Sequence, residues 1–184
     1  MDGTAARRRQ ARQAPGQGHR RLPLERHPRR HRGEDPHPHR APGRPHRYPY
    51  ASDLPITASS ADWGIVQRDK SPAGNPITIE GVHHAKGLGA HAESSALFYL
   101  GGGCRTFDAT VGIDDEDGPQ GSVTFEVWAD GRKVAESGVI RGTDPGQSFT
   151  ADVTGAGEVE LRTTDAADGN YYDHSDWAEA RFTC

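Results

Sequence analysis

Large apolar and sulfur-containing residues are scarce in this chain of 184 residues. Hydrophobic residues make up 33% and aromatic residues 7%, with only two cysteines and one methionine. No run of about 18 apolar residues occurs, so we expect no membrane-spanning helix. The beginning of the chain also lacks the apolar run of about 7 to 15 residues that an export signal needs. The length favours one domain with an appendage over a two-domain enzyme, because domains cluster near roughly 100 to 150 residues.

The first 47 residues lack serine, valine, isoleucine, asparagine, lysine, cysteine and every aromatic residue. They hold 13 of the 22 basic residues, all arginine, and carry a net charge of +9, whereas residues 48–184 carry −13. Their only large apolar side chains are Leu22 and Leu24, which cannot offset about 1 to 2 kcal/mol of backbone entropy per residue. We therefore expect a disordered leader over residues 1–47 and a folded domain over residues 48–184.

The leader has three interpretations. An arginine arm for nucleic acid is one of them, but the leader has no aromatic residue for base stacking, and the acidic domain that follows would repel phosphates. We therefore expect no nucleic-acid partner. The restriction to Arg, Pro, His, Gly and Ala is also typical of GC-rich DNA read in a wrong frame, in which case the true upstream sequence is missing. A histidine metal tract around His37 and His39 is the third interpretation, without a fixed scaffold to support it.

From Tyr48 onward the sequence alternates between apolar and polar residues, as half-buried strands do. The clearest alternation lies in residues 107–113 and 123–128. Further strands are expected at 77–80, 97–100, 133–140, 148–153, 159–163 and 178–183. The Asp130-Gly131 pair accepts positive φ angles and predicts a two-residue type I′ hairpin. Eight or so short strands indicate an all-β, antiparallel β-sandwich of the jelly-roll type.

The two cysteines, Cys104 and Cys184, are expected to form a disulfide that closes a loop of about 80 residues and adds roughly 4 to 5 kcal/mol of stability. Two unpaired thiols are the alternative. A disulfide implies an oxidising compartment, so we expect an extracellular, secreted protein even though the chain shows no export signal.

The segment 165–177 offers the strongest chemical signal. It gathers four aspartates with asparagine, tyrosine, histidine and tryptophan in one loop between strands. Calcium prefers six to eight oxygens from such loops, whereas sugars prefer carboxylates and amides beside an aromatic face. We interpret the loop as a site of one of these kinds, and we expect Trp177 itself to be a core residue.

Other polar segments are interpreted more simply. Asp114 to Asp117 are expected to form a solvated turn, and as a paired-carboxylate glycosidase site they are weak because adjacent carboxylates diverge. His83 and His84 would point to opposite faces of a strand, and no nucleophile with its base and oxyanion hole is evident. The glycines after Lys86 lack the spacing of a phosphate loop, so we expect a close backbone approach at a strand bend.

Three sequence motifs then occur together, "KGLGAHA", "VGIDDE" and "YDHSDWA". With "YASDLP", "DWG" and "WAEARFTC" around them, residues 48–184 resemble the novel putative carbohydrate-binding module (NPCBM) family, grouped with carbohydrate-binding module family 51. The resemblance implies a galactose-binding-like jelly roll that is often attached to secreted glycoside hydrolases. Members bind terminal galactose or related sugars through loops at one end, and calcium is reported in the family.

The resemblance also implies site residues. The carbohydrate-binding candidates are Trp63, His91, Asn170, Tyr171 and His174. The calcium candidates are Asp53, Asp173, Asp176 and Glu179.

We therefore expect a noncatalytic carbohydrate-binding module that acts as a monomer, binds a galactose-type glycan and is a fragment of, or accessory to, a secreted glycoside hydrolase. A structural spacer domain whose sugar site has decayed and a small carbohydrate-active enzyme are the alternatives.

Overall fold

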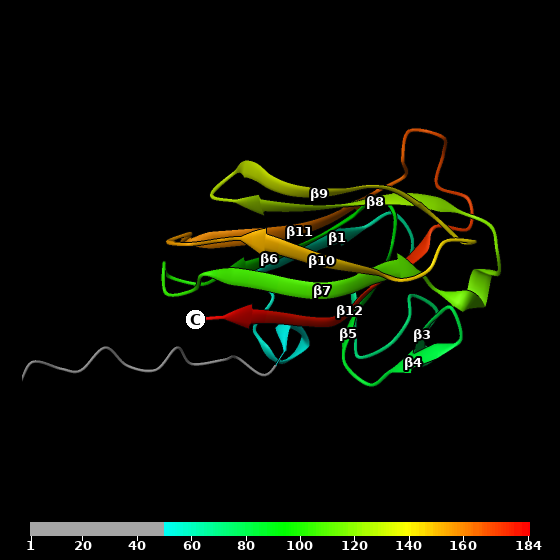
Figure 1. The fold of residues 1–184 in the computed structure, drawn as a ribbon, viewed down its shortest axis with the longest axis horizontal. Coiled ribbons are helices and arrows are strands. Elements are labelled where there is room, and N and C mark those ends of the chain that lie inside the picture. The colour runs from blue at the N-terminus through cyan, green and yellow to red at the C-terminus, as the bar shows by residue number, and fades with distance from the viewer. Residues whose placement is uncertain (1–49) are drawn as a thin grey trace, which may run out of the picture. The chain divides into compact units, whose positions relative to one another are not determined.

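The computed structural model describes residues 50–184, which contain twelve strands, and ten of these form a β-sandwich of two five-stranded sheets (Figure 1). Sheet I has the spatial order β1 (Ala58–Ala61), β6 (Ser94–Tyr99), β11 (Glu158–Thr164), β8 (Ser122–Ala129) and β9 (Arg132–Arg141). Sheet II has the order β10 (Gln147–Asp152), β7 (Thr106–Ile113), β12 (His174–Thr183), β5 (Gly87–His91) and β2 (Gln67–Arg68). The predicted leader over residues 1–47 lies outside the described residues.

Four short elements complete this part of the chain. Strands β3 (Ile77–Ile79) and β4 (Val82–His84) form a separate hairpin, and two 3₁₀ helices, η1 (Ala51–Asp53) and η2 (Asp115–Asp117), lie in loops. Every strand pair among these residues is antiparallel. The prediction of an all-β antiparallel sandwich is therefore confirmed.

The core lies between the two sheets and is built by the alternation seen in the sequence. Trp177 on β12 is 2% exposed, so it is a core residue as predicted. Its ring contacts Phe125 of sheet I edge to face, with centroids 4.9 Å apart, and also Phe107 and Phe149 of sheet II. Each such aromatic side chain contributes about 1.5 to 3 kcal/mol by leaving water. The contact between Trp177 and Phe125 therefore helps to hold the two sheets together.

The connection between β8 and β9 is the predicted two-residue hairpin. Asp130 and Gly131 have φ angles of 48° and 75°, both positive as a type I′ turn requires. The Asp130 carboxylate accepts hydrogen bonds from the backbone N–H groups of Gly157 and Glu158. The turn is thereby attached to the start of β11.

The glycine-rich segment after Lys86 forms strand β5, which lies inside sheet II between β12 and β2. A Cβ atom on Gly89 would lie 2.3 Å from the carbonyl oxygen of Lys70, so only glycine fits this close approach. On β7, which β12 separates from β5 in the same sheet, a Cβ on Gly112 would lie 2.6 Å from the side chain of Ile79. The predicted close backbone approach is confirmed, and it lets the β3–β4 hairpin pack on sheet II.

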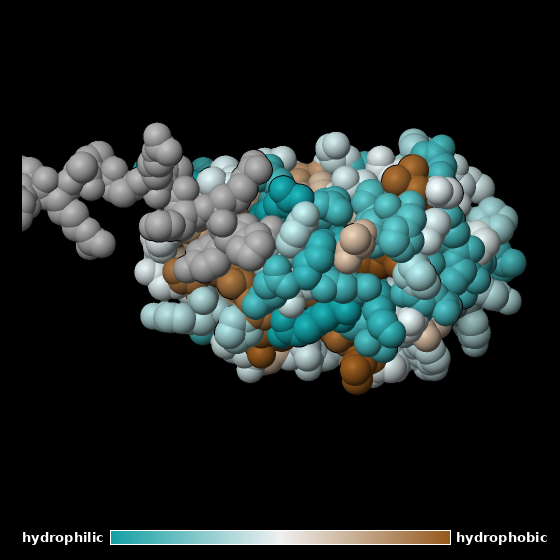
Figure 2. All heavy atoms as spheres, turned by 90° about the horizontal axis from the view of Figure 1, so that it is seen from below, coloured by the Kyte–Doolittle hydropathy of each residue, from teal (hydrophilic) through white to brown (hydrophobic). Residues whose placement is uncertain are grey.

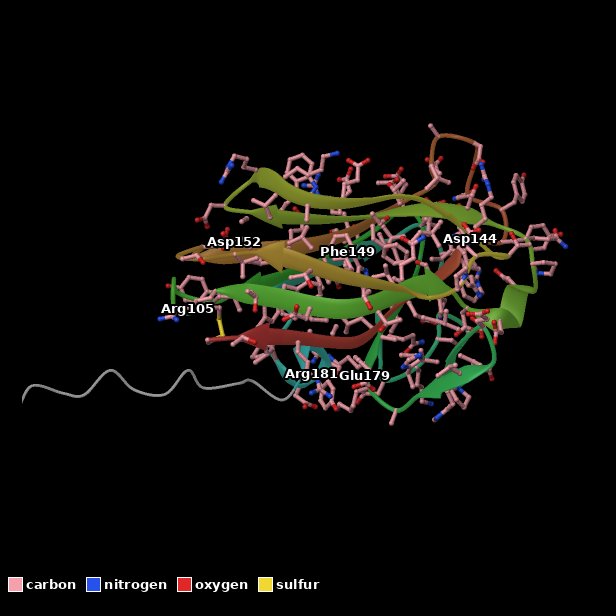
Figure 3. The ribbon with its side chains drawn as sticks, viewed as in Figure 1. Arg105, Asp144, Phe149, Asp152, Glu179 and Arg181 are labelled. Atoms are coloured by element: carbon pink, nitrogen blue, oxygen red, sulfur yellow. A yellow bond between two sulfur atoms is a disulfide. The ribbon has the colours of Figure 1, made fainter. Side chains whose placement is uncertain are left out.

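Cys104 and Cys184 form the predicted disulfide, visible as the yellow bond beside Arg105 in Figure 3. It joins the start of β7 to the residue that follows β12, where the Arg105 N–H also donates to the Thr183 carbonyl at 2.8 Å. The disulfide therefore secures the end of a strand in the middle of sheet II.

The side of the molecule that lies at the bottom of Figure 1, where β12, β5 and the β3–β4 hairpin are, is largely hydrophilic, with its hydrophobic residues in small separate patches (Figure 2). Within residues 50–184, no helix is both long and apolar enough to span a bilayer.

Candidate functional site

Three aromatic rings meet at the end of the sandwich where β5 ends and β12 begins. His91 and His174 are paired residues across these two strands, and their rings lie 5.2 Å apart at 82°. Trp63, from the loop after β1, stacks on His174 with centroids 5.1 Å apart at 27°, and lies 6.1 Å from His91. Trp63 is 51% exposed. We call these three rings the aromatic site.

Hydrogen bonds fix both imidazoles. His91 Nδ1 lies 2.6 Å from the Ala92 carbonyl oxygen, and His174 Nδ1 lies 2.6 Å from Glu116 Oε1. Because a carbonyl or carboxylate oxygen can only accept, each Nδ1 is the donor, and Nε2 of the neutral ring is then an acceptor. The site therefore presents two oriented imidazoles beside an exposed indole.

Glu116 is the anchor for His174. Burial opposes its ionisation, but hydrogen bonds from Ser71, Asn75, the Ala73 N–H and His174 together lower the pKa of Glu116. The acidic segment 114–117 forms a turn as predicted, since η2 spans Asp115–Asp117. The prediction of a solvated turn is wrong for Asp114, which is buried and accepts from the Thr78 N–H, while the exposed Asp115 accepts from the Glu80 and Gly81 N–H groups.

The loop 165–173 is joined to the aromatic site by hydrogen bonds at two places, of which one is the Ala92 N–H to the Asp173 carbonyl at 3.2 Å. The Asn170 amide donates to the Asp62 carboxylate, which precedes Trp63 in the sequence. Tyr171 is 83% exposed and is not among the rings that stack at the site. Of the five predicted sugar contacts, the structure thus brings together Trp63, His91 and His174, with Asn170 attached through Asp62, and leaves Tyr171 facing solvent.

Asp62 and Glu116 are residues of this site that sequence reasoning missed. Asp62 could have been found from its position next to Trp63 in the "DWG" motif. Glu116 likewise ends the "VGIDDE" motif, but the motif does not identify its partner, because His174 is 58 residues away in the sequence.

Two of the four calcium candidates pair with cationic side chains. Lys86 Nζ lies 2.6 Å from Asp53 Oδ1 and 2.6 Å from Asp69 Oδ2, and hydrogen bonds to these two carboxylates raise the pKa of Lys86. Glu179 lies 2.9 Å from Arg181, and Figure 3 shows both on the outer side of β12. Asp53 and Glu179 are therefore near the same lysine, whose carbonyl accepts from the Glu179 N–H, but each already has a cationic partner.

The other two candidates are fully buried carboxyls. Burial raises the pKa of Asp173 to about 6, opposed by a hydrogen bond from Ser122 N–H and assisted by the charges of Asp168, Asp165 and Asp117. For Asp176, burial raises the pKa well above its usual value, and the neighbouring carboxyl of Asp114 raises it further.

These two carboxyls have different neighbours, and the four calcium candidates do not form one coordination set. Among residues 50–184, no group of three or more His, Cys, Asp or Glu side chains is arranged to hold a metal ion. Three carboxyl oxygens of these two candidates are buried without a hydrogen-bond partner: Oδ2 of Asp173 and both oxygens of Asp176. Calcium binding stays a prediction.

The chemistry of the aromatic site suits a sugar. An exposed indole face can cover the apolar face of a pyranose ring, and the imidazole nitrogens and the Asp62 carboxylate can accept from its hydroxyl groups. Such a shallow polar site orients a ligand through a few placed groups.

Comparisons with known proteins agree with this chemistry. The profile of the NPCBM/NEW2 domain matches residues 47–183. A Renibacterium salmoninarum protein named "Putative endo-alpha-N-acetylgalactosaminidase" is 37% identical over 150 residues, which cover 78% of this chain and 10% of that protein. Alpha-1,3-galactosidase B of Akkermansia muciniphila is 31% identical over 139 residues, covering 70% of this chain and 16% of that protein. The chain thus spans less than a fifth of either relative.

Two solved structures from Clostridium perfringens share the fold. The CBM51-2 and INT domains of ZmpB, with GlcNAc bound to CBM51-2, match with a TM-score of 0.69 and 34% identity, over 73% of this chain and 31% of that one. The CBM51 of GH95 in complex with methyl-galactose matches with a TM-score of 0.68 and 32% identity, over 73% of this chain and 98% of that one.

Proposed function

The chain belongs to the NPCBM/NEW2 domain family, and on that premise we propose that residues 48–184 form a noncatalytic carbohydrate-binding module whose ligand is terminal galactose or a related sugar. The observation that carries the proposal is the stacking of half-exposed Trp63 on His174, with His91 at right angles to it. This arrangement presents an apolar ring face and two hydrogen-bonding nitrogens to the same ligand.

The choice of sugar rests on the relatives. One solved relative binds methyl-galactose and another binds GlcNAc, and the A. muciniphila relative is a galactosidase. Galactose is the first ligand to test and GlcNAc the second. Because both full-length relatives are much longer than this chain and named as glycosidases, the module would act as the accessory domain of a secreted glycoside hydrolase.

Further parts of the proposal concern the location of the module, its oligomeric state and calcium binding. The Cys104–Cys184 disulfide supports an extracellular location, because disulfides persist in oxidising compartments. We propose that the module is a monomer. Measuring its mass by light scattering after gel filtration tests this. Any calcium would bind beside Asp173, because Asp53 and Glu179 have cationic partners, and because burial and the neighbouring Asp114 carboxyl raise the pKa of Asp176, which favours its protonated form over a calcium ligand. The cation would neutralise the repulsion between Asp173 and the neighbouring aspartates.

The test is the Trp63→Ala substitution, measured by titration calorimetry with methyl-galactoside and GlcNAc. We expect a dissociation constant of about 10 µM to 1 mM for the wild type, which corresponds to roughly 4 to 7 kcal/mol. Loss of the indole face should weaken binding about ten- to a hundredfold, since an aromatic contact of this size contributes about 1.5 to 3 kcal/mol.

Tyr99→Ala is the matched control, because Tyr99 is a 70% exposed aromatic residue at the far end of β6. It should leave the affinity unchanged. If neither sugar binds to the wild type at millimolar concentration, or if Trp63→Ala binds as tightly as the wild type, the proposal is wrong and a spacer domain becomes the better interpretation.

A further inference from the structure

A second hollow lies on the exposed face of sheet I. Its volume is about 280 Å³, close to the lower end of the roughly 300 to 1,000 Å³ of small-molecule sites. The residues that matter in its lining are Ser60, Glu93, Ser95, Glu126, Glu160 and Arg162. We call this hollow the sheet groove. Its polar lining contains hydroxyl, carboxylate and guanidinium groups, which are the groups that bind sugar hydroxyls.

Strand register places four of these side chains in one row. Ser60 is paired with Ser95, Ser95 with Arg162, and Arg162 with Glu126. Neighbouring strands lie about 4.8 Å apart, so a row across four strands is about 14 Å long. That length accommodates more than one sugar ring side by side along the row.

Contacts within the protein fix the guanidinium group of Arg162, the cation of this row, without any ligand. The guanidinium of Arg162 lies over the Trp128 ring, 4.2 Å from its centroid, and Nη2 lies 2.7 Å from Glu160. Trp128 is itself fixed, because its indole N–H donates to Glu126 at 2.6 Å. Groups held in this way lose little conformational entropy when a ligand binds.

The sheet groove begins next to the aromatic site. Ser60 lies three residues before Trp63, and Glu93 lies two residues after His91. The two segments are joined directly, since the Asp62 N–H donates to the Glu93 carbonyl at 2.8 Å. A chain that leaves the aromatic site along β1 and β6 therefore enters the groove.

We propose that the sheet groove binds the second and third sugar rings of a neutral oligosaccharide whose terminal ring occupies the aromatic site. This inference rests on the proposed function, since it assumes a terminal sugar at Trp63. The groove contains three glutamates for one arginine, and the nearby Lys133 already pairs with Glu126 and Glu136. Carboxylates or sulfates on the glycan would be repelled, so the ligand class is neutral.

The experiment compares methyl-galactoside with neutral tetrasaccharides that end in α- or β-linked galactose, by titration calorimetry on the full chain. We expect one tetrasaccharide to bind about tenfold more tightly than the monosaccharide, the gain from one or two further hydrogen bonds. Arg162→Leu and Ser95→Ala should each remove most of that gain and leave methyl-galactoside binding unchanged. Glu158→Ala, an exposed glutamate on the same strand outside the groove, is the control and should change neither affinity.

The outcomes separate the two proposals. If methyl-galactoside and the tetrasaccharides all fail to bind, the proposed function fails and the groove proposal fails with it. If the monosaccharide binds but no tetrasaccharide binds at least threefold more tightly, only the groove proposal is overturned. The groove proposal is also overturned if Arg162→Leu and Ser95→Ala both keep the full gain in affinity of the tetrasaccharide over methyl-galactoside. It is overturned as well if a sialylated tetrasaccharide shows as large a gain in affinity as a neutral one.

Discussion

The buried carboxyl of Asp173 makes the stability of the domain depend on pH. A free aspartate ionises near a pKa of about 3.9, whereas the pKa of folded Asp173 is about 6. Between these values the folded state holds one more proton than the unfolded state. The stabilisation from this proton is fully present below about pH 4 and is lost as the pH rises through 6.

The size of the effect follows from the difference of about two pKa units. At about 1.4 kcal/mol per unit this gives at most about 3 kcal/mol, and water reaching the loop would reduce it to between about 1 and 3 kcal/mol. The Asp173→Asn substitution should abolish this part of the pH dependence. Its amide oxygen can keep the hydrogen bond from the Ser122 N–H, and the repulsion from Asp168 and Asp165 disappears.

The assay is urea unfolding of both proteins from pH 4 to pH 8 in the presence of a chelator. The variant should match the wild type near pH 4 and exceed it by about 1 to 3 kcal/mol at pH 8. Asp176 titrates in both proteins, so the difference between the two curves isolates Asp173. Asp108→Asn is the control, since Asp108 lies on β7 and accepts from Thr106 and Thr150. A wild-type minus variant difference that stays constant across the pH range would refute the reasoning.

Two further predictions concern the disulfide and calcium. Replacing Cys104 and Cys184 together by alanine opens a loop of 80 residues and should cost about 4.5 kcal/mol in the chain-entropy model, or a fall of roughly 15 °C in the thermal midpoint; a fall under about 3 °C would contradict this. Calcium at a hundredfold excess over its Kd should stabilise the wild type by about 2.7 kcal/mol and Asp173→Asn much less. A rise in midpoint that magnesium equals would count against the calcium proposal.

Alternation along the sequence predicted the strands that face the core on one side only. β7 and β8 carry this pattern and were predicted nearly to their ends. β5 was missed because Gly87 to Ala90 are buried on both faces, which removes the alternation. β1, with the sequence Ala-Ser-Ser-Ala, is almost entirely exposed and has no large apolar residue to mark it as a strand.

The sequence predicted the three aromatic residues of the candidate site, but not the residues that form hydrogen bonds around them. Trp63, His91 and His174 came from motifs that resemble a family, and the structure brings them together. The partners depend on contacts between residues far apart in the sequence, such as Asn170 with Asp62 across 108 residues. The cationic partner of the calcium candidate Asp53 could not be predicted either, because its ion pair with Lys86 depends on how β5 packs against η1.

The direction of β12 gives the domain an orientation. This strand begins at His174 in the aromatic site and ends at Thr183 beside the disulfide (Figure 1). Its ten residues span about 30 Å at roughly 3.3 Å per residue. A sensor surface, a bead or a fluorescent protein attached at the C-terminal end, after Cys184, would therefore lie at the opposite end of the domain from the aromatic site. The loops around the site would stay accessible to a glycan-coated surface.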